Sequence, residues 1–123
     1  PYIVVNDRIV NSNFNISHTS GVGVVVFSDC NIGIDIEKIN DVNLKIARRF
    51  FVKNEQRYIF EVDSDSEQRK RFFEIWTKKE AYWKCDGRGL AGGIQNVNVL
   101  EKKYAYQQIE ICGSQYAIAV YFT

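Results

Sequence analysis

Two neighbouring carboxylates, Asp35 and Glu37, carry the strongest chemical signal in this sequence. They belong to the alternating stretch 31–37, in which isoleucine occupies every second position, so a strand would place both on one face, about 6.6 Å apart. Gly33 falls on the same face and leaves open space beside them. Like charges this close repel each other unless a cation lies between them, and Mg²⁺ prefers such oxygen ligands. The alternative is the solvated outer face of a half-buried strand.

A second charged pair, Glu80 and Lys84, lies on one face of a predicted helix, because the two residues are four positions apart. Trp76 lies one turn earlier. A carboxylate beside a bulky aromatic ring is partly desolvated, which helps it hold a metal ion or accept a proton. The alternative is an ordinary exposed ion pair that stabilises the helix only slightly.

Ser17 and His18 precede a glycine and a strand, in what the sequence predicts to be a loop. A hydroxyl, an imidazole and free N–H groups in such a loop can bind a phosphate. The alternative is a packed or solvent-facing loop histidine. The glycine-dense segment 87–93 is either a mobile lip over a site or a helix stop followed by a connector. No serine or cysteine has the partners that nucleophilic catalysis requires.

Several elements must position these residues. Strands are predicted at 22–27 and 31–37, as an antiparallel pair joined by a turn, and the tail predicts two or three strands of an antiparallel meander at 96–99, 104–112 and 115–122. Residues 2–5 fit an edge strand or a linker.

Helices are predicted at 42–51, 55–60 and 67–85, the last capped by Asp65 or Ser66 and ended by Gly87. Helical spacing places several apolar side chains on one side of the longest helix: Phe72, Phe73, Ile75, Trp76 and Trp83. Leu44, Ala47, Phe50 and Phe51 do the same in the first helix. The order of elements predicts an α+β fold, an antiparallel sheet packed against a long helix plus shorter helices.

The composition limits the class of protein. The 123 residues correspond to one domain, residues 1–123, and a net charge of +1 argues against a dedicated nucleic-acid binder. No apolar run reaches the length of a membrane span. Three widely spaced cysteines, Cys30, Cys85 and Cys112, predict free thiols in a reducing compartment, the cytoplasm. Cys85 is expected to pack at a helix end. The chain begins at Pro1 and contains no methionine, so we expect a fragment or a processed chain.

Five short motifs, in this order, resemble the 4′-phosphopantetheinyl transferase superfamily, specifically the surfactin-synthetase-activating type. They are NISH at 15–18, IGIDIE at 32–37, RFF at 49–51 with Glu55, WTKKEAYWK at 76–84, and GRGL at 87–90. The resemblance covers residues 14–90, and the tail is similar to the family's closing strands only in pattern.

The resemblance implies a role for each site residue. Asp35, Glu37 and Glu80 would bind the Mg²⁺ that holds the pyrophosphate of coenzyme A. Ser17 and His18 would contact its 3′-phosphate, and Lys84 would neutralise the transferring phosphate. Glu80, or a metal-held water beside it, would take the proton from a carrier-protein serine.

The implied reaction moves 4′-phosphopantetheine from coenzyme A to a serine of an acyl, peptidyl or aryl carrier protein. Such transfer depends on positioning and charge neutralisation more than on a protein nucleophile. The basic residues Arg48, Arg49 and Lys53 would meet the acidic carrier protein, or form only a solvated face. The partners are thus coenzyme A and a carrier protein, with no nucleic acid and no membrane.

Family members of this type carry two similar halves, with the site between them. This chain resembles the C-terminal half, in which residues 1–13 would be the linker between halves. A missing N-terminal half or self-association would complete the site, and the isolated half can be inactive. Arg88 stands where the family often has lysine, which keeps the charge but changes its shape. The alternative function is a module that binds coenzyme A or the carrier protein without turnover; a third is a plain structural α+β domain.

Overall fold

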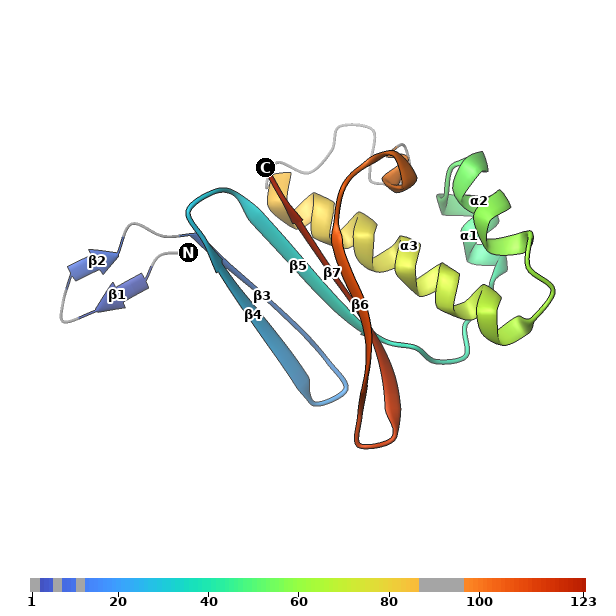
Figure 1. Cartoon of the computed structure of the whole chain (residues 1–123), viewed down its shortest axis with the longest axis horizontal. Coiled ribbons are helices and arrows are strands. Elements are labelled where there is room, and N and C mark those ends of the chain that lie inside the picture. The colour runs from blue at the N-terminus through green and yellow to red at the C-terminus, as the bar shows by residue number, and fades with distance from the viewer. Residues whose placement is uncertain (1–2, 6–7, 11–12, 87–96) are drawn as a thin grey trace.

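The described strands and helices are segregated along the chain, with β1 to β5 first, then the helices, then β6 and β7, which is the α+β arrangement that the sequence predicts (Figure 1). A computed structural model describes residues 3–5, 8–10, 13–86 and 97–123. In chain order the elements are β1 (Ile3–Val5), β2 (Arg8–Val10), β3 (Asn13–Thr19), β4 (Val22–Ser28), β5 (Ile32–Lys38), α1 (Lys45–Phe50), α2 (Lys53–Phe60), α3 (Asp65–Asp86), the 3₁₀ helix η2 (Val99–Glu101), β6 (Ala105–Ile111) and β7 (Ser114–Phe122).

The described strands form antiparallel sheets: the hairpin β1–β2, the hairpin β3–β4, and a three-stranded sheet in the order β5-β7-β6. The prediction that β4 pairs with β5 is therefore wrong. The partner of β5 is β7, in a register that places Ala119 opposite Asp35 and Ala117 opposite Glu37. These small residues share the face of the carboxylates and leave room for a helix to pack there.

Helix α3 lies against this face of the three-stranded sheet and approaches β5 closely (Figure 1). A Cβ atom at Gly33 would lie only 2.1 Å from the carbonyl oxygen of Ala81 and 2.5 Å from the amide nitrogen of Cys85. The prediction of open space beside Gly33 is wrong, because the main chain of α3 fills it. Further along the same face, the rings of Tyr82 and Tyr121 lie 4.9 Å apart. Glycine at position 33 is thus what lets the helix contact the strand.

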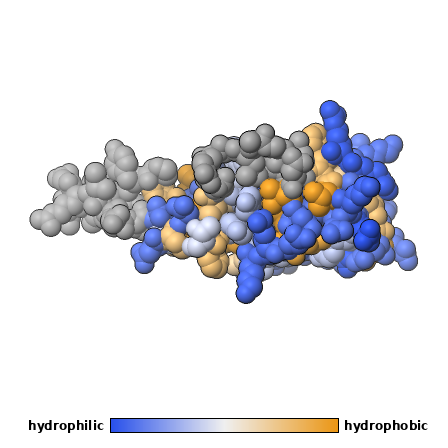
Figure 2. All heavy atoms as spheres, turned by 90° about the horizontal axis from the view of Figure 1, so that it is seen from above, coloured by the Kyte–Doolittle hydropathy of each residue, from blue (hydrophilic) through white to orange (hydrophobic). Residues whose placement is uncertain are grey.

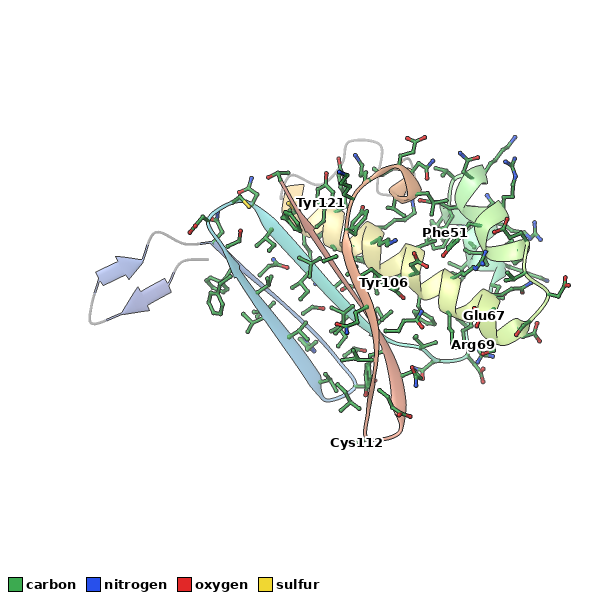
Figure 3. The ribbon with its side chains drawn as sticks, in the orientation of Figure 1. Phe51, Glu67, Arg69, Tyr106, Cys112 and Tyr121 are labelled. Atoms are coloured by element: carbon green, nitrogen blue, oxygen red, sulfur yellow. The ribbon has the colours of Figure 1, made fainter. Side chains whose placement is uncertain are left out.

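The core lies between the three helices and the sheet. Its buried members are Ala47, Phe51, Ile59, Phe72, Phe73, Ile75, Val99 and Ala117. Figure 3 shows Phe51 at the α1–α2 end and Tyr106 between the sheet and α3. Phe50 and Trp83 are predicted to lie on the apolar sides of their helices. This prediction is wrong for both, because their side chains are 40% and 43% exposed. Cys85 is buried near the end of α3, as predicted.

Element boundaries differ from the predicted ones in three places. Helix α1 is shorter than the predicted 42–51, and α3 begins at Asp65 because the hydroxyl of Ser64 accepts the Glu67 N–H at 3.3 Å, so Ser64 caps it rather than Asp65 or Ser66. The predicted strand at 96–99 is not found in its described part, where residues 97–98 are irregular and η2 begins at Val99. Gly87, Arg88 and the glycine-dense segment 87–93 lie outside the described residues.

A buried ion pair joins α2 to α3. Lys79 Nζ lies 2.9 Å from Glu55 Oε1, and both side chains are almost fully buried. Glu55 also accepts the N–H groups of Val52 and Val99, and Lys79 donates to the Val97 carbonyl at 2.6 Å. The pair therefore fixes α3 against α2 and the start of η2. Among the described residues, no helix combines the length and apolar character needed to cross a bilayer.

Candidate active site

The Asp35 carboxylate is the most constrained charged group in this region. It is 4% exposed, lies on the face of β5 that α3 covers, and its Oδ1 atom accepts the Ser17 hydroxyl at 3.2 Å. Its Oδ2 atom is buried and has no hydrogen-bond partner among the described residues. Burial, and then the charge of Glu37, raises the pKa of Asp35 from 3.8 to about 7. A buried carboxylate with one unpartnered oxygen is costly unless a ligand engages it.

Glu37 and Glu80 share the electrostatic environment of Asp35. Burial raises the pKa of both, and the charge of Glu80 raises the pKa of Asp35 and of Glu37 further. For Glu37, the charge of Lys84 and then the hydrogen-bonding side chain of Trp76 lower the pKa and partly offset this rise. The structure therefore brings the three predicted carboxylates, from β5 and α3, within mutual electrostatic reach. Each would be more stable with positive charge nearby.

Lys84 supplies part of that positive charge. Its Nζ atom lies 3.4 Å from Asp35 Oδ1 and 3.1 Å from the Ile34 carbonyl oxygen, and its charge lowers the pKa of all three carboxylates. The contacts of Lys84 are thus with β5 rather than the exposed ion pair with Glu80 that the sequence offered as the alternative. Lys84 instead reaches from α3 to the outer edge of β5, about one turn beyond Glu80.

Ser17 and His18 lie in strand β3, so the prediction of a loop is wrong. Successive residues of a strand face opposite ways. Ser17 is buried against β5, whereas His18 is exposed on the other face of β3. The structure brings Ser17, but not His18, to the carboxylates. The alternation of polar and apolar residues at 13–17 is the signal that indicates this strand.

The donor set fits a hard cation such as Mg²⁺, although no three Asp, Glu, His or Cys side chains in the described part of the chain stand close enough to hold a metal among them. Mg²⁺ commonly keeps several waters and is bound by one or two carboxylates together with substrate phosphates. The unpartnered Oδ2 of Asp35, with Glu37 and Glu80 nearby, meets that requirement.

Sequence reasoning missed two contributors to this site. Asn15 accepts a hydrogen bond from the Ile34 N–H at 3.0 Å, and Trp76 lowers the pKa of Glu37 rather than that of Glu80. Asn15 is two residues from Ser17, so the two share a face of β3. That spacing was the available signal, whereas the Trp76–Glu37 contact depends on how α3 lies on β5.

The sequence that carries the charged cluster matches one known family of transferases. Residues 31–123 match the family profile described as the 4′-phosphopantetheinyl transferase superfamily. The chain belongs to this superfamily. The matched residues include α3 and all three strands of the sheet β5-β7-β6, so they contain every proposed metal ligand.

Several characterised proteins are similar in sequence. The chain is 39% identical to 4′-phosphopantetheinyl transferase Sfp of Bacillus subtilis over 88 residues, which are 72% of this chain and 39% of that protein. It is 41% identical to 4′-phosphopantetheinyl transferase gsp of Aneurinibacillus migulanus over 78 residues, 63% of this chain and 32% of that protein. A third relative, a 4′-phosphopantetheinyl transferase of Bacillus subtilis, is 32% identical over 111 residues, 90% of this chain and 48% of that protein.

These relatives confirm the resemblance to the surfactin-synthetase-activating type. The chain spans less than half the length of each of the three.

Proposed function

We propose that this chain forms the metal-binding half of an enzyme that transfers the 4′-phosphopantetheine of coenzyme A to a carrier-protein serine. The observation that carries the proposal is the buried Asp35 carboxylate, which has one unpartnered oxygen and two further carboxylates within electrostatic reach. A solvated strand face does not account for it, because β5 is buried on both faces from Ile32 to Ile36. The names of the similar proteins support the same reaction.

Asp35, Glu37 and Glu80 would hold a Mg²⁺ ion in this proposal. Because the three side chains do not by themselves form a metal-binding cluster in the described part of the chain, substrate phosphates and waters would have to complete the site. When bound, Mg²⁺ would neutralise the pyrophosphate of coenzyme A and orient it for displacement. The mutual repulsion of the three carboxylates supports a cation site, because a bound divalent ion would relieve it.

The remaining chemistry falls to Glu80 and Lys84. Glu80 would accept the proton of the carrier-protein serine, whose oxygen forms a bond to the β-phosphorus of coenzyme A. The bond from that phosphorus to the bridging oxygen breaks, and 3′,5′-ADP leaves with the electron pair. Burial raises the pKa of Glu80, which makes it a better proton acceptor than an exposed carboxylate. The Lys84 ammonium would stabilise the negative charge on the transferring phosphate.

The segment Ser17–His18 would contact the 3′-phosphate of coenzyme A. Of the two side chains, the His18 imidazole is exposed on β3 and accessible to a ligand, whereas that of Ser17 is buried. Lys84 would provide a further contact with the phosphates.

An acyl, peptidyl or aryl carrier protein would dock at the α1–α2 end, which Figure 2 shows as mostly hydrophilic. Its exposed basic side chains include Lys45, Arg48, Arg49, Lys53 and Arg57. Beside them lies an apolar groove of about 160 Å³, lined by Val42, Ile46, Phe72, Phe73 and Trp76. Trp76 is common to this groove and to the site, because its side chain also lowers the pKa of Glu37. Positive charge around an apolar groove suits an acidic partner with an apolar anchor.

Carrier-protein modification, followed by mass spectrometry with coenzyme A and Mg²⁺, tests the proposal on the intact protein. The expected result is a mass increase of one phosphopantetheine group that requires Mg²⁺ and is lost in Asp35→Ala. An Asp35→Ala variant with wild-type activity would contradict the proposed roles. The exposed carboxylate Glu110, on β6, provides a matched control as Glu110→Ala.

The second candidate is a module that binds coenzyme A or a carrier protein without turnover. The observation that favours it is that the chain spans less than half of its relatives, so that a missing N-terminal half, joined through 1–13, or a second copy would supply the rest of the site. Calorimetry on the 123-residue chain with and without Mg²⁺ separates the two, since binding without turnover supports the module. The cytoplasm is the proposed location, and three thiols, at Cys30, Cys85 and Cys112, suit a reducing compartment.

A further inference from the structure

Along the outer edge of β5, main-chain N–H groups donate hydrogen bonds to side chains rather than to a neighbouring strand. β5 pairs with β7 along its other edge and leaves the N–H groups of Ile34 and Ile36 facing outward. The Asn15 Oδ1 atom accepts the Ile34 N–H at 3.0 Å, and the Ser17 hydroxyl accepts the Ile36 N–H at 3.2 Å. Because Asn15 and Ser17 are two residues apart on β3, their spacing matches that of the two N–H groups. The two side chains thus replace a strand ladder along this edge.

The Ser17 hydroxyl also binds Asp35. It donates its proton to Asp35 Oδ1 at 3.2 Å, and the Ser17 side chain is buried. A hydroxyl has only one proton to donate. A phosphate oxygen, as an acceptor, would need that same proton. The hydroxyl therefore cannot hydrogen-bond a ligand's phosphate while it holds Asp35.

This arrangement fixes one oxygen of Asp35, while the other oxygen is buried and has no hydrogen-bond partner among the described residues. Oδ1 is held by Ser17 from β3 and by Lys84 from α3, while Oδ2 is the unpartnered atom. Groups that orient a metal-binding carboxylate typically contribute about 10–100-fold to metal affinity. The contacts of Asn15 and Ser17 with the main chain on either side of Asp35 add to this constraint, because they prevent β5 from shifting along β3.

We propose that Asn15 and Ser17 are positioning residues that orient Asp35 for metal binding, and that the Ser17 hydroxyl acts through Asp35 rather than on coenzyme A. The inference rests on the proposed function, since it takes Asp35 as a metal ligand. It assigns recognition of the 3′-phosphate, within the segment Ser17–His18, to His18.

Binding of Mn²⁺ to the intact protein, measured by electron paramagnetic resonance without coenzyme A, tests the inference directly. Ser17→Ala and Ser17→Cys are expected to bind Mn²⁺ about 10–100-fold more weakly than wild type. Ser17→Thr, which keeps the hydroxyl, is expected to retain most of the affinity. Asn15→Ala should show a smaller loss, because Asn15 contacts the main chain beside Asp35 and not the carboxylate. The nearly isosteric Ser17→Cys variant covers the case in which Ser17→Ala fails to fold.

A second measurement separates positioning from phosphate recognition. The ratio of kcat/KM for coenzyme A to that for 3′-dephospho-coenzyme A should be unchanged in Ser17→Ala and reduced in His18→Ala, while His18→Ala binds Mn²⁺ normally. Wild-type Mn²⁺ affinity in both Ser17→Ala and Ser17→Cys would overturn the inference, as would a reduced ratio in Ser17→Ala with metal binding intact. Those results would leave the proposed function standing, whereas a wild-type protein that binds no Mn²⁺ would overturn both.

Discussion

The close approach at Gly33 makes the Gly33→Ala variant a sensitive test of how the site is assembled. The new Cβ atom would lie 2.1 Å from the Ala81 carbonyl oxygen, whereas ordinary contacts begin at 3.4 Å, so β5 and α3 must separate by about 1.3 Å. The obstacle is main chain and cannot rotate away. Overpacking of this kind costs about 1–3 kcal/mol of folding free energy.

The functional loss should be larger than the loss of stability suggests. Asp35 lies on β5, and Glu80 and Lys84 lie on α3, so separating the two elements moves one part of the site from the other. A displacement of about 1 Å can lower a rate about 10²-fold. We therefore expect Gly33→Ala to lose about 10²-fold in kcat/KM at a temperature where it remains folded.

Urea unfolding and the carrier-protein modification assay measure the two effects. Gly23→Ala in β4 is the matched control, because its Cβ atom would meet nothing closer than 3.9 Å. This variant should be as stable and as active as the wild type. If Gly33→Ala unfolds within about 0.5 kcal/mol of the wild type and keeps full activity, the described contact between β5 and α3 is wrong.

Two further predictions follow from buried charges. Lys79→Met should cost about 3–5 kcal/mol in urea unfolding, because it leaves the buried Glu55 carboxylate unpaired; a loss below about 1 kcal/mol would contradict the buried pair. The raised pKa of Asp35, about 7 against 3.8, means that the folded state binds this proton more tightly than the unfolded state. Its stabilising contribution is complete below pH 3.8 and is lost as the pH rises through 7. With a chelator present, the melting temperature should therefore fall between about pH 5 and pH 8, and Mg²⁺ should reduce this fall, whereas an equal fall with and without Mg²⁺ would contradict a metal at Asp35.

Local patterns were sufficient to predict the elements that carry the site. The alternation at 31–37 gave β5, and helical spacing gave α3 with Glu80 and Lys84 on one face. The α+β class followed from the order of these elements. Strand β3 could also have been predicted, because polar and apolar residues alternate at 13–17. Its polar residues are weak strand formers, however, and hide the pattern.

The pairings that assemble the site depend on contacts far apart in the sequence. Alternation of side chains shows that β5 is a strand but not that β7 is its partner. The alternation shows only which face of the sheet each side chain occupies, not which strand pairs along either edge of β5. The role of Gly33 depends on the path of α3 and has no local signal. The buried ion pair of Lys79 does have a partial local signal in the sequence. Lys79 lies one turn after Ile75, on the buried side of α3, and a lysine there requires a buried partner.

The central claim is that Asp35 binds a divalent ion together with Glu37 and Glu80. Titration of the intact protein with Mn²⁺, for wild type, Asp35→Asn and the exposed control Glu110→Gln, tests it most directly. The account predicts one site that Asp35→Asn loses and Glu110→Gln retains. Equal Mn²⁺ affinity in Asp35→Asn and in the wild type would contradict it.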